Sequence, residues 1–234
     1  MSEAETGQPT FDLGAGRLCL DFANTADWHR SARPEERLRS YADLLAWGRQ
    51  AAALTAGEAE RLLRAAQRRP ADAADVLRRA IALREAIYRL FSTLAAGRPP
   101  ADADLAVLNA ALAEALPRLR LAATAEGFAW TWAGDEDALD AVLWPVARSA
   151  AELLTASERD RVRECADDNC GWLFLDMSRN RSRRWCSMKG CGNRAKARRY
   201  YARQQRAARQ QRAARQQRAT RQADSSPAGR TPQN

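Results

Sequence analysis

The 234-residue chain has one histidine, two lysines and no run approaching 18 apolar residues. The missing apolar run argues against a membrane-spanning helix. The first eight residues are acidic and polar, without a basic segment followed by an apolar one, so no secretory signal is predicted. We therefore expect a cytoplasmic protein with no membrane partner.

Signals of catalysis are also few. Because His29 is the only histidine, a Ser-His-Asp arrangement could be built only around that residue, and no Gly-x-Ser-x-Gly turn accompanies it. No glycine-rich phosphate-binding loop is present. We predict a protein that is not an enzyme and has no catalytic residues, and a site at His29 is the alternative.

The charge is distributed unevenly. Residues 1–160 carry 19 Arg and 24 Asp or Glu, a net charge of −5, whereas residues 161–234 carry 19 Lys or Arg and 5 acids, a net charge of +14. An abundance of arginine throughout the chain would not reverse the sign between the two parts. Clustered cations bind phosphates by releasing condensed counterions, so the basic part indicates a polyanionic partner.

The acidic part reads as a mainly helical domain with a small sheet. Residues 12–24 predict a turn followed by a strand through Leu18, Leu20 and Phe22. Apolar spacing and capping signals then predict five helices. They are expected at residues 38–47, after the capping pair Thr55 and Glu58, at 76–94, at 102–116, and at 139–154 with a kink at Pro145.

A switch to alternating apolar residues between Arg118 and Trp132 predicts a hairpin with a turn near Glu126 and Gly127. Phe128, Trp130 and Trp132 then share one face of a strand. We expect this aromatic face to belong to the core, with a ligand pocket as the alternative.

Four cysteines follow a pattern typical of a metal site: Cys165-x4-Cys170-x15-Cys186-x4-Cys191. Two close pairs separated by such an insert supply the tetrahedral thiolate ligands of Zn²⁺. An iron-sulfur cluster uses the same ligands and remains an alternative. Cys19 lies alone among apolar residues and is expected to be a buried core residue.

Local signals complete this module. Residues 172–175 and 184–186 are expected to pair as strands around the polar turn 178–182. Asn193 is a good helix N-cap, so a helix is expected from about Arg194. With few apolar residues of its own, the module is expected to unfold when zinc is removed.

Two resemblances follow from these residues. Cys170–Asp176, Ser178–Asn180, Arg184–Met188 and Cys191–Lys196 resemble the CGNR zinc-finger family of bacterial proteins, and Gly16–Thr25 resembles the ABATE domain of stress-induced transcription regulators. They imply an α+β fold, cysteine-bound zinc and DNA binding. The expected domains are a disordered N-terminus (1–10), an ABATE-like domain (11–156), a CGNR-type finger (160–203) and a basic helix or disordered tail (204–234).

The basic residues of the module are candidates for nucleic-acid contact, because cations at a helix N-terminus oppose the helix dipole and imply another role. A solvated basic face is the alternative. The candidates are Arg179, Arg181, Arg183, Arg184, Lys189, Arg194, Lys196, Arg198, Arg199 and Arg203.

Residues 204–221 repeat Gln-Gln-Arg-Ala-Ala-Arg, the last copy imperfectly. Arginine at every third position distributes charge around a helix without an apolar seam. Partial disorder that folds on a polyanion is expected there, with a frayed tail from Asp224 to Asn234.

The function predicted from these features is a zinc-dependent, DNA-binding bacterial transcriptional regulator. Its partner would be double-stranded DNA, and its N-terminal domain would form a homodimer or sense a small-molecule effector. The alternative is a zinc-stabilised module that binds proteins or RNA.

Overall fold

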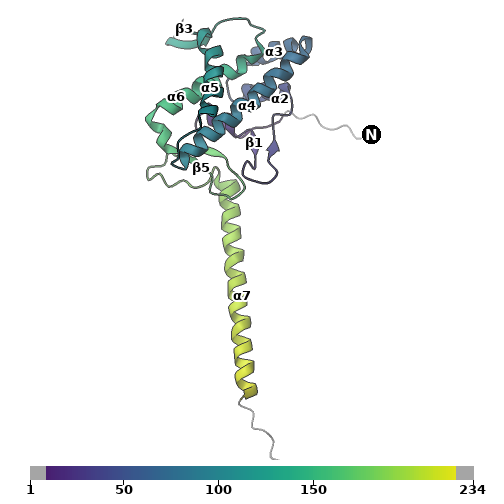
Figure 1. Cartoon of the computed structure of the whole chain (residues 1–234), viewed down its shortest axis with the longest axis vertical. Helices are drawn as coiled ribbons and strands as arrows, with labels where there is room; N and C mark the ends of the chain where they lie inside the picture. Colours follow the sequence, from purple (N-terminus) through teal and green to yellow (C-terminus); the bar gives the residue numbers. More distant parts are fainter. Residues whose placement is uncertain (1–8, 225–234) are drawn as a thin grey trace, which may run out of the picture. The chain divides into compact units, whose positions relative to one another are not determined.

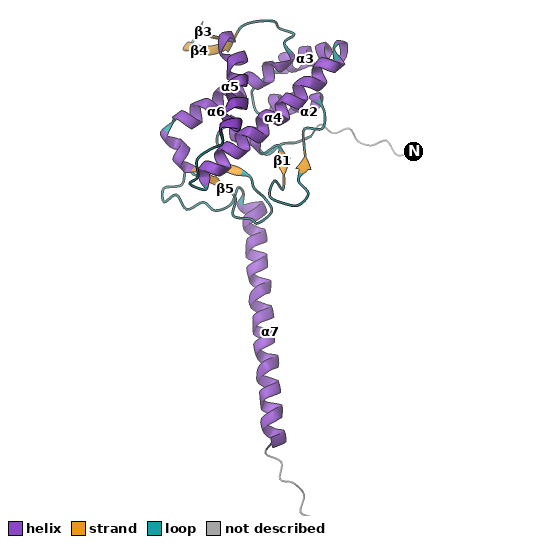
Figure 2. Ribbon diagram, viewed as in Figure 1, coloured by secondary structure: helices purple, strands orange, loops and turns teal. Residues whose placement is uncertain are grey.

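A computed structural model describes residues 9–224, with side chains described for residues 9–217. The chain divides into two units, one ending at Cys191 and the other beginning at Gly192. Within the described residues, the first unit is mainly helical with three two-stranded antiparallel sheets, and the second contains one long helix (Figure 1 and Figure 2). The predicted α+β fold class is confirmed. Residues 1–8 and 225–234, where disordered ends are predicted, lie outside the described residues.

The described part of the first unit, residues 9–191, contains six α-helices, and 3₁₀ turns follow α5 and lie on either side of α6. The α-helices are α1 (Leu18–Ala23), α2 (Tyr41–Gln50), α3 (Ala56–Arg68), α4 (Pro70–Ala95), α5 (Asp102–Ala115) and α6 (Trp144–Thr155). The 3₁₀ turns are η1 (Leu116–Arg118), η2 (Leu139–Leu143) and η3 (Ser157–Arg161).

Local sequence signals define several helix ends. Ser40 with Asp43 caps α2, and Thr55 with Glu58 caps α3, each through a reciprocal pair of hydrogen bonds. Helix α4 ends just before Gly97, whose φ of +69° suits glycine. These helices confirm the predictions made from apolar spacing.

The strands form three separate pairs. β1 (Ala26–Asp27) pairs with β2 (Glu35–Glu36), β3 (Leu119–Thr124) with β4 (Gly127–Trp132), and β5 (Val162–Glu164) with β6 (Leu173–Leu175). The β3–β4 pair is the predicted hairpin.

Helix α4 organises the core. It runs through the first unit and contacts α1, α2, α3 and α5, as well as β5 and β6 (Figure 1). Leu83, Ile87, Leu90 and Phe91 on α4 are at most 2% exposed. The strands β5 and β6 also contribute buried side chains to this core, so they are part of the main hydrophobic cluster.

Several local predictions are wrong, and the first concerns residues 12–24. Leu18–Ala23 is helix α1 instead of a strand, with Cys19, Leu20, Phe22 and Ala23 all fully buried. A short, nearly continuous apolar run buries side chains in every direction, so alternation within it does not identify a strand. Cys19 is a core residue, as predicted.

The second correction concerns Pro145. It does not kink a helix that spans residues 139–154, because it lies in the first turn of α6, after the 3₁₀ turn η2. Proline is compatible with the first turn, where its missing N–H has no intrahelical acceptor.

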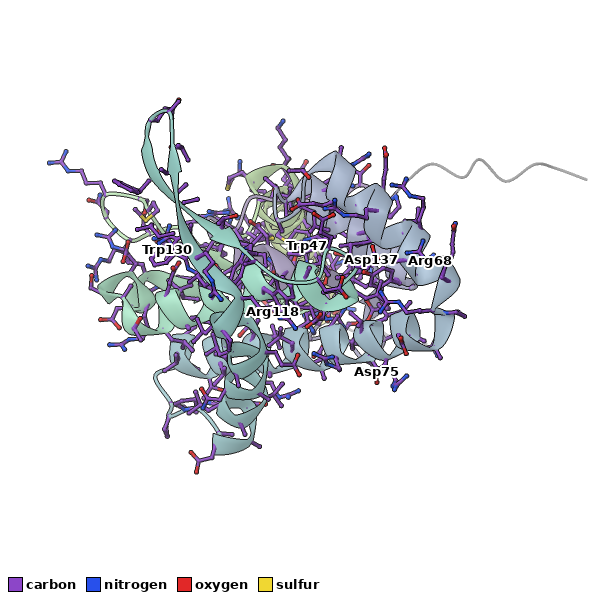
Figure 3. The ribbon with its side chains drawn as sticks, turned by 90° about the horizontal axis from the view of Figure 1, so that it is seen from above. Trp47, Arg68, Asp75, Arg118, Trp130 and Asp137 are labelled. Carbon is purple, nitrogen blue, oxygen red and sulfur yellow. The ribbon has the colours of Figure 1, made fainter. Side chains whose placement is uncertain are left out.

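The third correction concerns the aromatic hairpin. Phe128 is 77% and Trp130 57% exposed, so the outer part of this face does not belong to the core. Only Trp132, at the base of β4, packs against another ring, Trp144 of α6, with 5.9 Å between centroids. Figure 3 shows Trp130 on the hairpin, whereas Trp47 lies among the crowded side chains of the interior.

The fourth correction concerns the strand pairing near the cysteines. Residues 172–175 contain β6, but its partner is β5, which precedes Cys165, and residues 184–186 form no strand. In the second unit, α7 (Asn193–Asp224) is one continuous helix, which is one of the two possibilities expected for the residues beyond 203.

Candidate metal centre and basic segments

The four cysteines are placed by the β5–β6 pair and by a helical turn. Cys165 follows β5, and Cys170 precedes β6, so the strand pairing brings the first pair together. Cys186 lies in the loop after β6, and Cys191 in a π-helical turn, η4 (Met188–Gly192). This turn runs into α7, whose first residue is Asn193, so Asn193 belongs to the helix and does not precede it as a cap.

The sulfur positions fit one metal ion. All four Sγ atoms lie within 4.8 Å of one another. The Sγ of Cys186 is 3.7 Å from that of Cys170 and 3.5 Å from that of Cys191. Four sulfurs about 2.3 Å from a tetrahedral Zn²⁺ would be separated by about 3.8 Å. A disulfide requires about 2.05 Å, and all four cysteines are free thiols.

The close spacing of the thiols favours a bound cation over four separate thiolates. The pKa of Cys165 is lowered because its sulfur interacts with Cys170 and then Cys186, while the interaction with Cys165 raises the pKa of Cys170. Buried thiolates at this spacing repel one another, so the four cannot ionise together unless a cation neutralises them. The donor set, with Cys165, Cys170 and Cys191 buried, therefore suits a soft or borderline metal ion such as zinc.

The loop between β6 and Cys186 is held by two buried or half-buried side chains. The carboxylate of Asp176, fully buried, accepts hydrogen bonds from the backbone N–H groups of Ser178 and Arg183, at 2.9 and 3.0 Å. The Arg183 guanidinium lies 4.2 Å from the centre of the Phe174 ring and donates to the carbonyls of Trp185 and Cys186. Arg183 thus holds the loop between β6 and Cys186, which we call the metal loop, through its backbone carbonyls.

A motif in the helical domain clamps the strand that follows Cys170. The buried Asn24 side chain donates to the carbonyl of Leu173 at 2.8 Å and accepts from its N–H at 2.9 Å. Asn24 therefore makes the two hydrogen bonds to Leu173 that a neighbouring strand would make. Nearby, the N–H of Leu175 donates to the carbonyl of Ala15, and the Trp172 indole donates to the carbonyl of Ala26. Sequence reasoning singled out Gly16–Thr25 but not this role.

A second set of contacts joins β5 to α4. Glu164 accepts hydrogen bonds from Tyr88 at 3.3 Å and from Ser92 at 2.7 Å. His29 stacks on Tyr88, with ring centroids 3.9 Å apart, and its Nε2 lies 3.2 Å from a Glu85 oxygen. The position of His29 between these side chains is that of a packing residue.

The basic candidates lie in both units. In the first unit Arg179, Arg181, Arg184 and Lys189 are exposed, while Arg183 is half-buried. In α7 all five candidates are exposed: Arg194, Lys196, Arg198, Arg199 and Arg203. Between Met177 and Ala223 the sequence contains 16 Arg or Lys and no acidic residue.

A helical domain that carries a four-cysteine site fitted to one metal ion defines this chain as a zinc-finger type of protein. Residues 16–157 match the ABATE family, described as "Putative stress-induced transcription regulator", and residues 161–204 match the CGNR zinc finger. The chain belongs to the ABATE family and carries a CGNR zinc finger. Neither is an enzyme family. No curated protein matches the chain.

Across residues 9–224, no helix combines the length and the apolar character needed to cross a bilayer.

Proposed function

We propose that this protein is a zinc-dependent, DNA-binding transcriptional regulator. One observation carries the proposal. Four cysteine sulfurs gather at the spacing of a single metal ion, and the 47 residues from Met177 to Ala223, which include two of these cysteines, contain no acid. The family descriptions support the same function.

In this proposal Cys165, Cys170, Cys186 and Cys191 hold one Zn²⁺. The ion fixes the loop that carries Arg179, Arg181, Arg184 and Lys189, and these side chains contact DNA phosphates together with the basic residues at the start of α7. Arg183 is assigned to the loop itself, because its guanidinium donates to backbone carbonyls there.

The test measures zinc content and duplex binding on the same purified full-length protein. We expect one zinc per chain and an affinity for random-sequence duplex DNA that falls with salt. If the zinc finger neutralises about five phosphates, these contacts contribute about −4.5 to the slope of log K against log salt. An affinity independent of salt, or one unaffected by zinc removal, contradicts the proposal.

Competition identifies the nucleic acid. We expect duplex DNA to displace labelled duplex DNA more effectively than duplex or single-stranded RNA of equal length. Preferential displacement by RNA would make the protein an RNA-binding module instead. Partner complexes that survive nuclease treatment, together with no binding to DNA, would favour a protein-interaction module.

For the helical domain we propose dimerisation through the β3–β4 hairpin. Cross-strand pairs share a face of a sheet, so Leu121 with Trp130 and Ala123 with Phe128 form one apolar face. Its outer side chains are 57–77% exposed.

Sedimentation equilibrium tests this assignment. We expect the protein to be dimeric and the double variant Phe128→Thr with Trp130→Thr to be monomeric with an unchanged melting temperature. Met177→Thr is the control, because Met177 is 65% exposed outside the hairpin. A monomeric wild-type protein, or a variant that remains dimeric, excludes the hairpin as the interface.

A further inference from the structure

Helix α7 continues beyond the part of the chain that matches the zinc finger, which ends at residue 204. The continuation consists of the Gln-Gln-Arg-Ala-Ala-Arg repeat, in complete copies at residues 204–209 and 210–215. Every side chain from residue 196 to residue 217 is exposed. This segment therefore has a surface of its own that the zinc-finger family does not account for.

The composition of this surface excludes two common roles. A coiled coil needs apolar residues at two positions of each heptad, and the repeat places only alanine, glutamine and arginine on every side of the helix. A self-supporting charged helix pairs acids with bases three or four residues apart, but no acid occurs between residues 193 and 223. No acid within this part of the helix pairs with these arginines, so their charge is available to an anionic partner.

The angular placement of the arginines specifies the shape of that partner. A step of three residues turns about 300° around an α-helix, so Arg206, Arg209, Arg212 and Arg215 are spread over about 180°. Arg206 and Arg215 consequently point to opposite sides of the helix. A single strand, or a flat anionic surface, offers phosphates to only one side.

The major groove of B-DNA has phosphates along both walls. It is about 12 Å wide and admits an α-helix, whose diameter is about 10–12 Å. The major groove of duplex RNA is deep and narrow and does not admit a helix in this way. From Arg206 to Arg215 the helix rises by about 14 Å, a length that a straight helix can follow in a curved groove.

We propose that residues 204–217 of α7 form a second DNA contact, in which the helix lies in a major groove and Arg206, Arg209, Arg212 and Arg215 bind phosphates on both walls. Phosphate contacts carry no direct sequence information, so these four arginines add affinity without reading a particular sequence. It rests on the proposed DNA-binding function and extends it beyond the zinc finger.

The experiment uses the full-length, zinc-loaded protein and a 30-base-pair duplex of random sequence, with fluorescence anisotropy over a series of salt concentrations. In the variant R206Q/R209Q/R212Q/R215Q we expect the salt slope to become shallower by about 3.6, which is 0.9 for each lost phosphate contact. Glutamine supports a helix nearly as well as arginine, so circular dichroism should show the same helix content.

Two half-variants test the placement on both walls. R206Q/R209Q and R212Q/R215Q should each make the slope shallower by about 1.8. If one half-variant binds like the wild-type protein, the contact is one-sided and the groove assignment is wrong. The matched controls are the quadruple Arg→Lys variant, which keeps the charge, and Gln204→Ala with Gln210→Ala, which keeps the arginines. Both should retain the wild-type slope.

The outcomes separate this contact from the proposed function. A wild-type protein that binds no DNA overturns the DNA-binding function itself. A wild-type protein that binds DNA, with an unchanged slope in the quadruple variant, overturns only the second contact. A quadruple variant that loses affinity for single strands as strongly as for duplexes overturns the groove as its site.

Discussion

The four-cysteine module and helix α7 are neighbours in the sequence and carry charge of the same sign, but they are built differently. The module has buried residues such as Val162, Leu173 and Phe174, and its strand β6 is clamped by Asn24 of the helical domain. Helix α7 has no buried side chain between residues 193 and 217. Buried side chains and the four-cysteine site hold the module together, whereas α7 depends on local helix propensity and carries exposed charge. Substitutions should therefore affect folding in the module and polyanion binding in α7.

The largest difference between the regions should come from removing a metal ligand. We expect Cys170→Ala to bind zinc much more weakly and to contain well below one ion per chain, because three thiolates leave the tetrahedral set one ligand short. Zinc in small finger peptides is worth about 10–16 kcal/mol, but β5 and β6 belong to the main core here. The loss should therefore loosen residues 176–191 and leave the helical domain folded.

Metal analysis and hydrogen exchange measure this outcome. Cys19→Ala is the control, because Cys19 lies fully buried in α1 and should leave the zinc content unchanged. Full zinc occupancy in Cys170→Ala would contradict the four-cysteine site. Unfolding of the whole chain would show that the strands depend on the metal more than their packing implies.

The clamp on β6 should have the next largest effect. Asn24→Ala leaves the buried N–H and C=O of Leu173 without their partner, at about 1–3 kcal/mol for each group. We expect the free energy of unfolding in urea to fall by about 4 kcal/mol. Arg209→Gln, on exposed α7, should change it by less than about 0.5 kcal/mol. Equal effects in the two variants would remove the distinction between the regions.

Glycine substitutions sharpen the same comparison within the first unit. Gly171 and Gly97 both have positive φ, +73° and +69°, which costs an alanine about 1–2 kcal/mol. At Gly171 an added Cβ would also lie 2.9 Å from the Cβ of His29, whereas at Gly97 it would meet nothing within 4 Å. We expect thermal unfolding to show a loss of about 3 kcal/mol for Gly171→Ala and about 1 kcal/mol for Gly97→Ala. A smaller loss at Gly171 would mean that the helical domain and the module are not packed closely there.

The smallest effect concerns pH. Burial raises the pKa of Asp21 to about 6 from 3.8, although its carboxylate accepts a hydrogen bond from Ala15. A raised pKa in the folded state means that the neutral carboxyl is favoured, so its contribution is complete below about pH 4 and is lost as the pH rises through about 6. Because solvent reaches part of the carboxyl, we expect a loss of about 1 kcal/mol.

Urea unfolding of the wild-type protein and of Asp21→Asn at several pH values measures the contribution of Asp21 to the free energy of unfolding. The difference in stability between them should change between pH 4 and 6 and stay constant above pH 7. A constant difference at all pH values would show that Asp21 titrates normally. Any pH dependence of zinc binding affects both proteins equally and cancels in the comparison.

Much of the fold could be predicted from local patterns. The capping pair of Thr55 and Glu58 acts through immediate neighbours, and the structure contains the helix that this pair predicts. The partner of β6 could not be predicted, because residues 184–186 and β5 are both short and only the packing against α1 and α4 favours β5. The exposure of Phe128 and Trp130 could not be predicted either. Alternating apolar residues show which side chains share a face of a strand, but not whether another element covers that face.

By itself, the sequence determined which cysteines are candidates for a metal site and which part of the chain is basic, because metal ligation and phosphate binding depend on residue type and spacing. It also determined the arginine repeat, whose angular spread follows from helix geometry alone. Only the tertiary structure decided that Asn24 holds β6, that β5 is its partner and that Arg183 supports the metal loop. These contacts join residues far apart in the chain, and burial selects them from many pairings that local propensity leaves equivalent.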